Sequence, residues 1–161
     1  MSLAYLGLGA NLGDAAETLR EAARRLADLG PVVARSSLYR TPAWGVTDQP
    51  PFVNAALALE TTLEPHALLA ALKDLERELG RTPTFRWGPR AIDLDILAYD
   101  GVRLDEPELT IPHARLAERA FALVPLAEIA PAFAGLRDAL PPSDLAAIER
   151  FGAFEREETP R

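Results

Sequence analysis

Residues 52–80, FVNAALALETTLEPHALLAALKDLERELG, carry the pattern that decides the fold. The first ten residues alternate, with Val53, Ala55, Leu57 and Leu59 on one side, which is the period of a β-strand. After Pro65 the leucines recur at the spacing of an amphipathic helix, and Gly80 supplies a C-terminal stop. The stretch therefore predicts a strand over residues 52–61 followed by a helix over residues 65–79.

The same pair of elements begins the chain. LAYLGLGA (residues 3–10) predicts a buried strand, and Asp14, with Glu17 three residues later, predicts the N-cap of a helix that Gly30-Pro31 ends. Further strands are predicted over residues 32–39 and 92–99. The order strand, helix, strand, strand, helix, strand indicates an α+β fold, a ferredoxin-like sandwich with two helices packed on one face of an antiparallel sheet.

The rest of the chain gives weaker signals. Residues 40–51 and 81–90 are rich in proline and glycine and are predicted to be loops. Asp100-Gly101 predicts a hairpin to a short strand near Val102, and a last helix is predicted over residues 143–151. At 161 residues we expect one domain, 1–161, with residues 151–161 forming a frayed tail.

Composition and charge exclude several classes of function. The net charge is −7, which argues against broad binding to nucleic acid or to anionic membranes. The chain has no cysteine, and no apolar run approaches the roughly 20 residues that span a bilayer. The first residues do not resemble a signal peptide, so we expect a cytoplasmic protein.

Two aspartates stand out in the predicted strand IDLDI (residues 92–96). Because strand side chains alternate, Asp93 and Asp95 share one face, separated by roughly 6.5 Å of strand rise. Such a pair can hold divalent cations, and Mg²⁺ prefers carboxylate oxygens together with substrate phosphates. A half-exposed strand with ordinary polar alternation is the competing interpretation.

Arginines precede this strand. Arg81, Arg86 and Arg90 lie in a segment, residues 80–91, that contains no acidic residue, although the protein as a whole is acidic. Arginines beside metal-binding carboxylates suit the transfer of a phosphate-type group, whose transition state is stabilised by charge and positioning. A solvated, positively charged loop is the alternative. The chain has no GxxxxGK[ST] and no GxGxxG motif.

Two further groups of residues suggest ligand contacts. Phe52 and Asn54 share the polar face of their strand. A flat heterocycle could stack on Phe52 and form hydrogen bonds with the donor and acceptor of Asn54. A surface aromatic residue that happens to lie beside an asparagine explains the pattern equally well. His113 precedes Arg115 and Arg119, which share one face if a helix begins there and would add donors for phosphate. Charged decoration of a helix end is the alternative for this group.

Five segments together resemble one enzyme family. GLGANLGD, YRTPAWG, DQPPFVNAAL, GRTPTFRWGPRAIDLDIL and LTIPHARLAERAFALVPLAEIAP occur in the order and spacing of the 6-hydroxymethyl-7,8-dihydropterin pyrophosphokinases, and the resemblance extends to about Pro131. It implies a monomeric ferredoxin-like enzyme of folate biosynthesis. Such an enzyme moves the pyrophosphoryl group of MgATP to the hydroxymethyl group of the pterin and releases AMP.

The resemblance also implies roles for individual residues. Asp93 and Asp95 match the aspartates that bind two Mg²⁺ ions, Arg81 and Arg90 match phosphate-contacting arginines, and Trp87 matches the tryptophan of a mobile loop. The residues expected near ATP are Arg86, Ile96, Thr110, His113, Arg115 and Arg119. The residues expected around the pterin are Thr41, Pro42, Trp44, Phe52, Asn54 and Phe121, with the ring sandwiched between the two phenylalanines.

The sequence departs from the family at two places. The loop reads TPTF between Arg81 and Arg86, where relatives often carry further basic residues, and Ala114 follows His113 where some members have tyrosine. Two other functions share part of the pattern. A two-metal phosphohydrolase would need more metal ligands, and a ferredoxin-like module binding a small effector or RNA would need a more basic, aromatic sheet surface.

Overall fold

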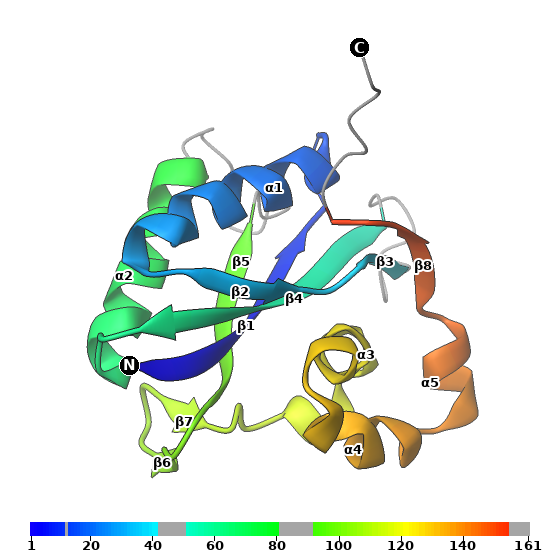
Figure 1. Ribbon diagram of the computed structural model, residues 1–161. Helices are drawn as coiled ribbons and strands as arrows, with labels where there is room; N and C mark the ends of the chain where they lie inside the picture. Colours follow the sequence, from blue (N-terminus) through cyan, green and yellow to red (C-terminus); the bar gives the residue numbers. More distant parts are fainter. Residues whose placement is uncertain (12, 42–50, 81–91, 155–161) are drawn as a thin grey trace.

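A computed structural model describes residues 1–11, 13–41, 51–80 and 92–154. Its centre is one antiparallel sheet in the order β5-β1-β4-β3-β8, with β2 also paired to β4. The strands are β1 (Ser2–Ala10), β2 (Val32–Arg35), β3 (Leu38–Thr41), β4 (Phe52–Thr61), β5 (Asp93–Tyr99) and β8 (Glu149–Gly152). The α+β class is confirmed, and the two longest strands, β1 and β4, pair with each other inside the sheet (Figure 1).

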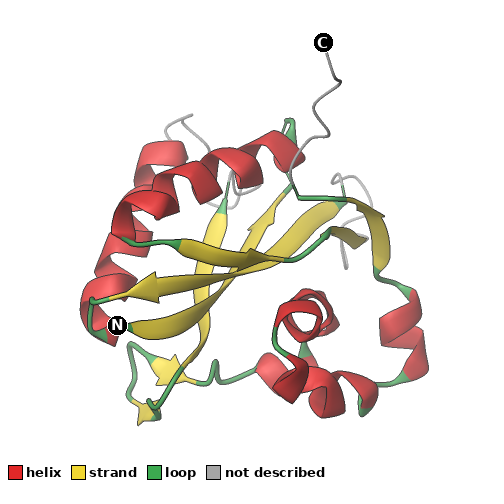
Figure 2. Cartoon of the chain, in the orientation of Figure 1, coloured by secondary structure: helices red, strands yellow, loops and turns green. Residues whose placement is uncertain are grey.

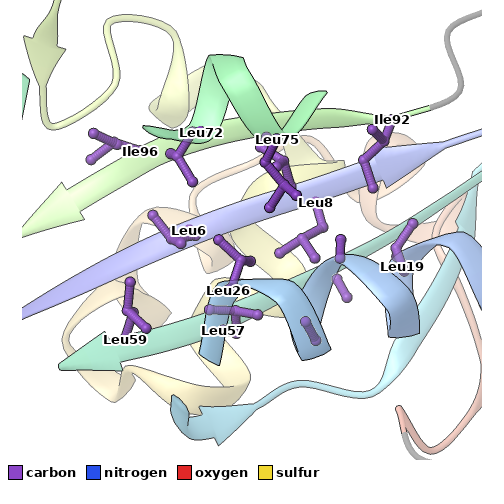
Figure 3. Packing of buried hydrophobic residues seen from close by; sticks show 14 of the residues in the cluster. Leu6, Leu8, Leu19, Leu26, Leu57, Leu59, Leu72, Leu75, Ile92 and Ile96 are labelled. Atoms are coloured by element: carbon purple, nitrogen blue, oxygen red, sulfur yellow. The ribbon is translucent and has the colours of Figure 1, made fainter. Parts of the chain in front are cut away.

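Two helices cover one face of this sheet, as predicted (Figure 2). They are α1 (Ala15–Leu26), continued by the 3₁₀ turn η1 (Ala27–Leu29), and α2 (Pro65–Leu79). Asp14 caps α1 by accepting the N–H of Glu17 at 3.1 Å, and Glu64 caps α2 by accepting the N–H of Ala67 at 3.1 Å. Leucines of both helices interlock with the alternate side chains of β1, β4 and β5 to form the main core (Figure 3).

A second group of helices lies on the opposite face of the sheet. It comprises the 3₁₀ turns η2 (Leu116–Glu118) and η3 (Pro131–Phe133) and the helices α3 (Ala120–Ile129), α4 (Ala134–Asp138) and α5 (Pro142–Ala146). Leu123 and Leu126 of α3 are fully buried and pack in one cluster with Ala56 of β4 and Leu97 of β5. The prediction of helices on one face is therefore right but incomplete, because α3 covers part of the other face.

The predicted strand over residues 32–39 is two strands, interrupted at Ser36 and Ser37. The N–H of Ser36 donates to the carbonyl of Ala56 at 2.8 Å, and the N–H of Ala56 donates to the hydroxyl of Ser36 at 2.9 Å. A side-chain oxygen thus replaces a backbone oxygen in the ladder, and the register shifts between β2 and β3.

Two predictions for the C-terminal third are wrong. The chain turns at Asp100-Gly101 but does not pair back on β5; instead β6 (Leu104–Asp105) pairs with β7 (Thr110–Ile111). The helix predicted over residues 143–151 ends at Ala146, and residues 149–152 form β8 beside β3. The second error arises because the pairing partner of residues 149–152 lies more than 100 residues earlier in the sequence.

The first residues of the predicted tail, 151–154, lie in the described part of the chain, with residues 151–152 in β8. Phe154 is 3% exposed within the main core, and its carbonyl accepts the Nε–H of Arg20 at 2.7 Å. Residues 155–161 lie outside the described part of the chain. Among the described helices, none is both long enough and apolar enough to cross a membrane.

Candidate active site

A cavity of about 320 Å³ opens on the sheet face opposite α1 and α2, beside the start of α3. Its walls come from β1, β3, β4 and β5 and from the segment that leads into α3. Eight of the residues predicted to carry function line it: Thr41, Phe52, Asn54, Asp93, Asp95, His113, Arg119 and Phe121. The fold therefore gathers side chains from segments 80 residues apart in one place.

The strand register explains how these side chains meet. Gly9 of β1 lies opposite Asn54 of β4 on one side and opposite Asp93 of β5 on the other, and Gly7 lies opposite Asp95. Residues directly opposite each other share a face of the sheet, and neighbouring strands lie about 4.8 Å apart. Asp93 and Asn54 are thus separated by the width of one glycine-bearing strand.

Gly7 and Gly9 form the floor of the cavity, although neither is among the residues predicted from the sequence to carry function. A Cβ atom on Gly9 would lie 2.8 Å from the side-chain oxygen of Asn54, and one on Gly7 would lie 3.2 Å from the Leu97 side chain. The signal was present in the sequence as two glycines at alternate positions of a strand, which marks a close approach to another group.

The aspartates occupy the face that alternation predicted. Ile92, Leu94 and Ile96 are buried in the main core, whereas Asp93 and Asp95 are half-buried and line the cavity. A bulge follows: Leu6 pairs with Ile96 and Tyr5 with Ala98, so Leu97 is the extra residue. Leu97 lines the cavity by the same alternation as Asp93 and Asp95, and the bulge then turns Tyr99 to the main core.

Asn54 is fixed by its neighbours. Its side chain is 7% exposed, and its Nδ2 donates a hydrogen bond to the hydroxyl of Thr41, 2.8 Å away on β3. Thr41 is itself 4% exposed. Phe52, two residues before Asn54, and Phe121, at the start of α3, line the same cavity. The cavity thus offers an amide, a hydroxyl and two aromatic rings, which suits a flat polar heterocycle.

His113 lies between opposite charges. Burial lowers its pKa; the nearby Asp95 carboxylate opposes this change, and the Arg119 guanidinium adds to it. Its Nδ1 accepts the backbone N–H of Arg115 at 3.3 Å, and its own backbone N–H donates to Leu97 at 2.9 Å. Because Nδ1 accepts the N–H of Arg115, the proton of the neutral imidazole lies on Nε2, where it can be donated to an anion.

No helix begins at His113, which was the condition for Arg115 and Arg119 to share one face. A 3₁₀ turn over Leu116–Glu118 intervenes, and α3 begins only at Ala120. Arg119 lines the cavity, with its guanidinium 5.6 Å from the centre of the Phe121 ring. Arg115 is exposed, pairs with Glu118 at 3.5 Å and does not line the cavity.

Other predicted residues stand outside the cavity walls. The side chain of Ile96 points into the main core, and the hydroxyl of Thr110 on β7 donates to the carbonyl of Glu106 at 3.3 Å. Six further residues lie outside the described part of the chain, so the structure does not test their predicted roles: Pro42, Trp44, Arg81, Arg86, Trp87 and Arg90.

Comparison with known families agrees with this geometry. The model of the 7,8-dihydro-6-hydroxymethylpterin-pyrophosphokinase (HPPK) family matches residues 5–131, a range that contains every residue of the cavity. The chain belongs to this family. It is therefore an enzyme, a pyrophosphokinase that transfers a pyrophosphoryl group to the hydroxymethyl group of the dihydropterin in folate biosynthesis.

Relatives of this pyrophosphokinase occur alone and in fusions. The 2-amino-4-hydroxy-6-hydroxymethyldihydropteridine pyrophosphokinase of Methylorubrum extorquens is 51% identical over 156 residues, covering 93% of this chain and 99% of the relative. The mitochondrial folate synthesis bifunctional protein of Pisum sativum is 45% identical over 77% of this chain, which spans 24% of that protein.

The solved structures share the fold at low identity. The HPPK-DHPS protein of Plasmodium falciparum with SDX-DHP aligns with a TM-score of 0.64 at 17% identity, over 86% of this chain and 43% of that one. A triple mutant of the same protein with pterin and p-hydrobenzoate aligns with a TM-score of 0.68 at 16% identity, over 92% of this chain and 47% of that one. These structures support the fold only.

Proposed function

We propose that the cavity beside α3 is the active site, that ATP is the pyrophosphoryl donor and that AMP is the second product. The observation that carries this proposal is the convergence of two aspartates, a histidine, an arginine, an amide and two phenylalanines on one cavity. The two carboxylates lie on β5, whereas the amide of Asn54 and the ring of Phe52 lie on β4, on the other side of Gly7 and Gly9. This division fits a charged donor and a flat acceptor bound side by side.

The acceptor pterin binds between Phe52 and Phe121 in this proposal. Its ring stacks on the two phenylalanines, and its edge hydrogen-bonds to Asn54 and Thr41, with Pro42 and Trp44 completing the pocket. We assign recognition of the pterin edge to Asn54 because its side chain is buried and held in one orientation by Thr41. A buried amide left unpaired is costly, so heterocycles without matching groups bind more weakly.

The donor set fits Mg²⁺. Asp93 and Asp95 offer two carboxylates on one face of β5, half-buried at the wall of the cavity, and hard oxygen ligands are those that Mg²⁺ prefers. We propose that they hold two Mg²⁺ ions together with the ATP phosphates. When bound, the metal supplies positive charge that stabilises the phosphates in the transition state.

The protein's own groups position the donor. His113 donates its Nε2 proton to a phosphate oxygen, and Arg119 adds a fixed positive charge on the same side of the cavity. Arg81, Arg86 and Arg90 provide further phosphate contacts and Trp87 closes over them, while Ile96, Thr110 and Arg115 bind the nucleoside end. The hydroxymethyl oxygen of the pterin then attacks the β-phosphorus in line with the departing AMP.

The decisive experiment measures nucleotide products. The purified chain is incubated with ATP, Mg²⁺ and 6-hydroxymethyl-7,8-dihydropterin, and we expect AMP in proportion to pterin diphosphate. Asp93→Asn and Asp95→Asn should each lower the rate at least about 100-fold. Asp100→Asn, which removes the same charge from the exposed turn after β5, is the matched control and should keep full activity. ADP or phosphate as the product, or active Asp93 and Asp95 variants, would contradict the proposal.

Two finer predictions concern the whole molecule. We propose that the enzyme acts as a monomer, as the family resemblance implies. We propose the cytoplasm as its location, in line with its family role in folate biosynthesis. Light scattering after size-exclusion chromatography tests the first proposal, and cell fractionation tests the second.

A further inference from the structure

The strand that carries both aspartates is the terminal strand of the sheet on its side. β5 pairs with β1, and in the order of the described strands no other strand follows it. An edge strand is held by one ladder of hydrogen bonds, so its outer backbone groups need other partners to stay in place. Metal-binding carboxylates tolerate little displacement, because Mg²⁺ demands near-ideal geometry.

Glu76 supplies such a partner. From the second half of α2, its Oε2 accepts the backbone N–H of Leu94 at 3.0 Å. Leu94 is the residue between Asp93 and Asp95, so this bond holds the peptide group at the centre of the aspartate pair. A hydrogen bond to an ionised acceptor is roughly twice as strong as a neutral one.

The Glu76 carboxylate is held in turn. Its side chain is 16% exposed, and its other oxygen, Oε1, lies 3.0 Å from the ammonium group of Lys73, one turn earlier on α2. The backbone carbonyl of Glu76 accepts the N–H of Gly80 at 2.8 Å, which closes the C-terminal end of the helix. Helix, lysine and carboxylate thus form a rigid support behind β5.

We propose that Glu76 is a positioning residue for the metal site: by fixing the Leu94 peptide it sets the separation and direction of the Asp93 and Asp95 carboxylates. The inference rests on the proposed function of these two aspartates. Partners that orient metal ligands typically change metal affinity about 10- to 100-fold when they are removed. Glu76 acts through the backbone and does not touch the metal or the substrates.

The test compares the metal dependence of the rate with pterin binding. In Glu76→Ala, the free Mg²⁺ concentration that gives half the maximal rate should rise about 10-fold or more. In Glu76→Gln, whose amide oxygen can still accept the Leu94 N–H, the rise should be smaller. Pterin affinity, measured without metal by calorimetry, should stay within about twofold, because the bond lies on the outer edge of β5.

A matched control comes from the same helix. Glu78→Gln removes the same charge two residues later, where the carboxylate pairs with Arg25 at the surface, and should leave the Mg²⁺ dependence unchanged. An unchanged Mg²⁺ requirement in both Glu76 variants overturns the inference. An equal loss of Mg²⁺ affinity and pterin affinity also overturns it, because such a result shows that Glu76 only supports the fold. If Glu76→Ala does not fold, Glu76→Gln decides the outcome by itself. The proposed function fails separately, if Asp93→Asn keeps the wild-type Mg²⁺ response.

Discussion

Gly9→Ala should lower the affinity for the pterin more than Gly7→Ala, the other substitution that adds a methyl group to the cavity floor. The new Cβ would lie 2.8 Å from the Asn54 oxygen, closer than real Cβ contacts allow. Asn54 cannot retreat, because β4 lies between β1 and β3, and Thr41 on β3 already holds the amide at 2.8 Å. The amide must therefore rotate out of its present orientation.

The free-energy cost of this rotation has two parts. Breaking the hydrogen bond between Asn54 and Thr41 costs about 1 kcal/mol, and overpacking a buried site costs a further 1–3 kcal/mol, roughly. We expect the melting temperature to fall by about 4–16 °C for a domain of this size. Because 1.4 kcal/mol is a factor of ten, displacing the reading amide should weaken pterin binding by about tenfold or more.

Gly7→Ala is the matched control. It adds the same methyl group to the same strand and the same cavity floor, but the nearest atoms are the ends of the Leu97 side chain at 3.2 Å, which can yield by a few tenths of an ångström. Its pterin affinity should stay within about threefold, equivalent to less than 1 kcal/mol. Calorimetric titration of both variants measures the difference. The proposal that Asn54, held by Thr41, recognises the pterin would be refuted if both variants lost the same pterin affinity, or if Gly9→Ala bound pterin as the wild type does.

Three further results are expected. Asn54→Ala should weaken pterin binding by about 1–3 kcal/mol and leave binding of nucleotide alone unchanged, as calorimetry with each ligand can show. Burial, and to a smaller extent the Glu128 carboxylate, raise the pKa of Tyr39 to about 12. The free energy of unfolding should therefore fall by up to about 3 kcal/mol as pH rises from 10 to 12, because only the unfolded chain loses the phenolic proton in this range. Urea unfolding of Tyr39→Phe should not show this pH dependence. Hydrogen bonds to Glu106, and to a smaller extent to Glu64, raise the pKa of His66. These bonds therefore stabilise the folded state fully below pH 6.5, and the stabilisation is lost as pH rises through the pKa of the folded state. The melting temperature of Glu106→Gln should depend less on pH than that of the wild type.

Local signals in the sequence predicted the elements that cover one face of the sheet. α2 has the predicted bounds because proline at its start, leucines at helical spacing and a terminal glycine all act within the helix itself. β8 was missed because its strand character comes from pairing with β3, more than 100 residues earlier, where Arg150 donates to the hydroxyl of Ser37 at 2.7 Å. Tertiary pairing outweighs local propensity in such short segments.

The candidate site was predictable in part for the same reason. Alternation alone placed Asp93 and Asp95 on the face opposite the main core, and the structure agrees. The arrangement that makes them useful depends on register, which joins Asp93, Gly9 and Asn54 in one row across three strands. Register between distant strands is set by the whole buried face, so a single strand sequence does not reveal it.

The cavity exists because one sheet face is divided between packing and binding. Tyr5, Ala56 and Leu97 on this face pack in the cluster beneath α3, as the helices on the other face pack on the main core. Toward the end of the sheet where β4 and β5 begin, the positions on the same face are Gly9, Asn54 and Asp93, two of them polar and one without a side chain. A helix packed tightly on such a row would have to bury a charged carboxylate, which is costly. The same residues that weaken packing there therefore keep the surface open for a ligand, and α3 begins beside the opening with Arg119 and Phe121 facing it.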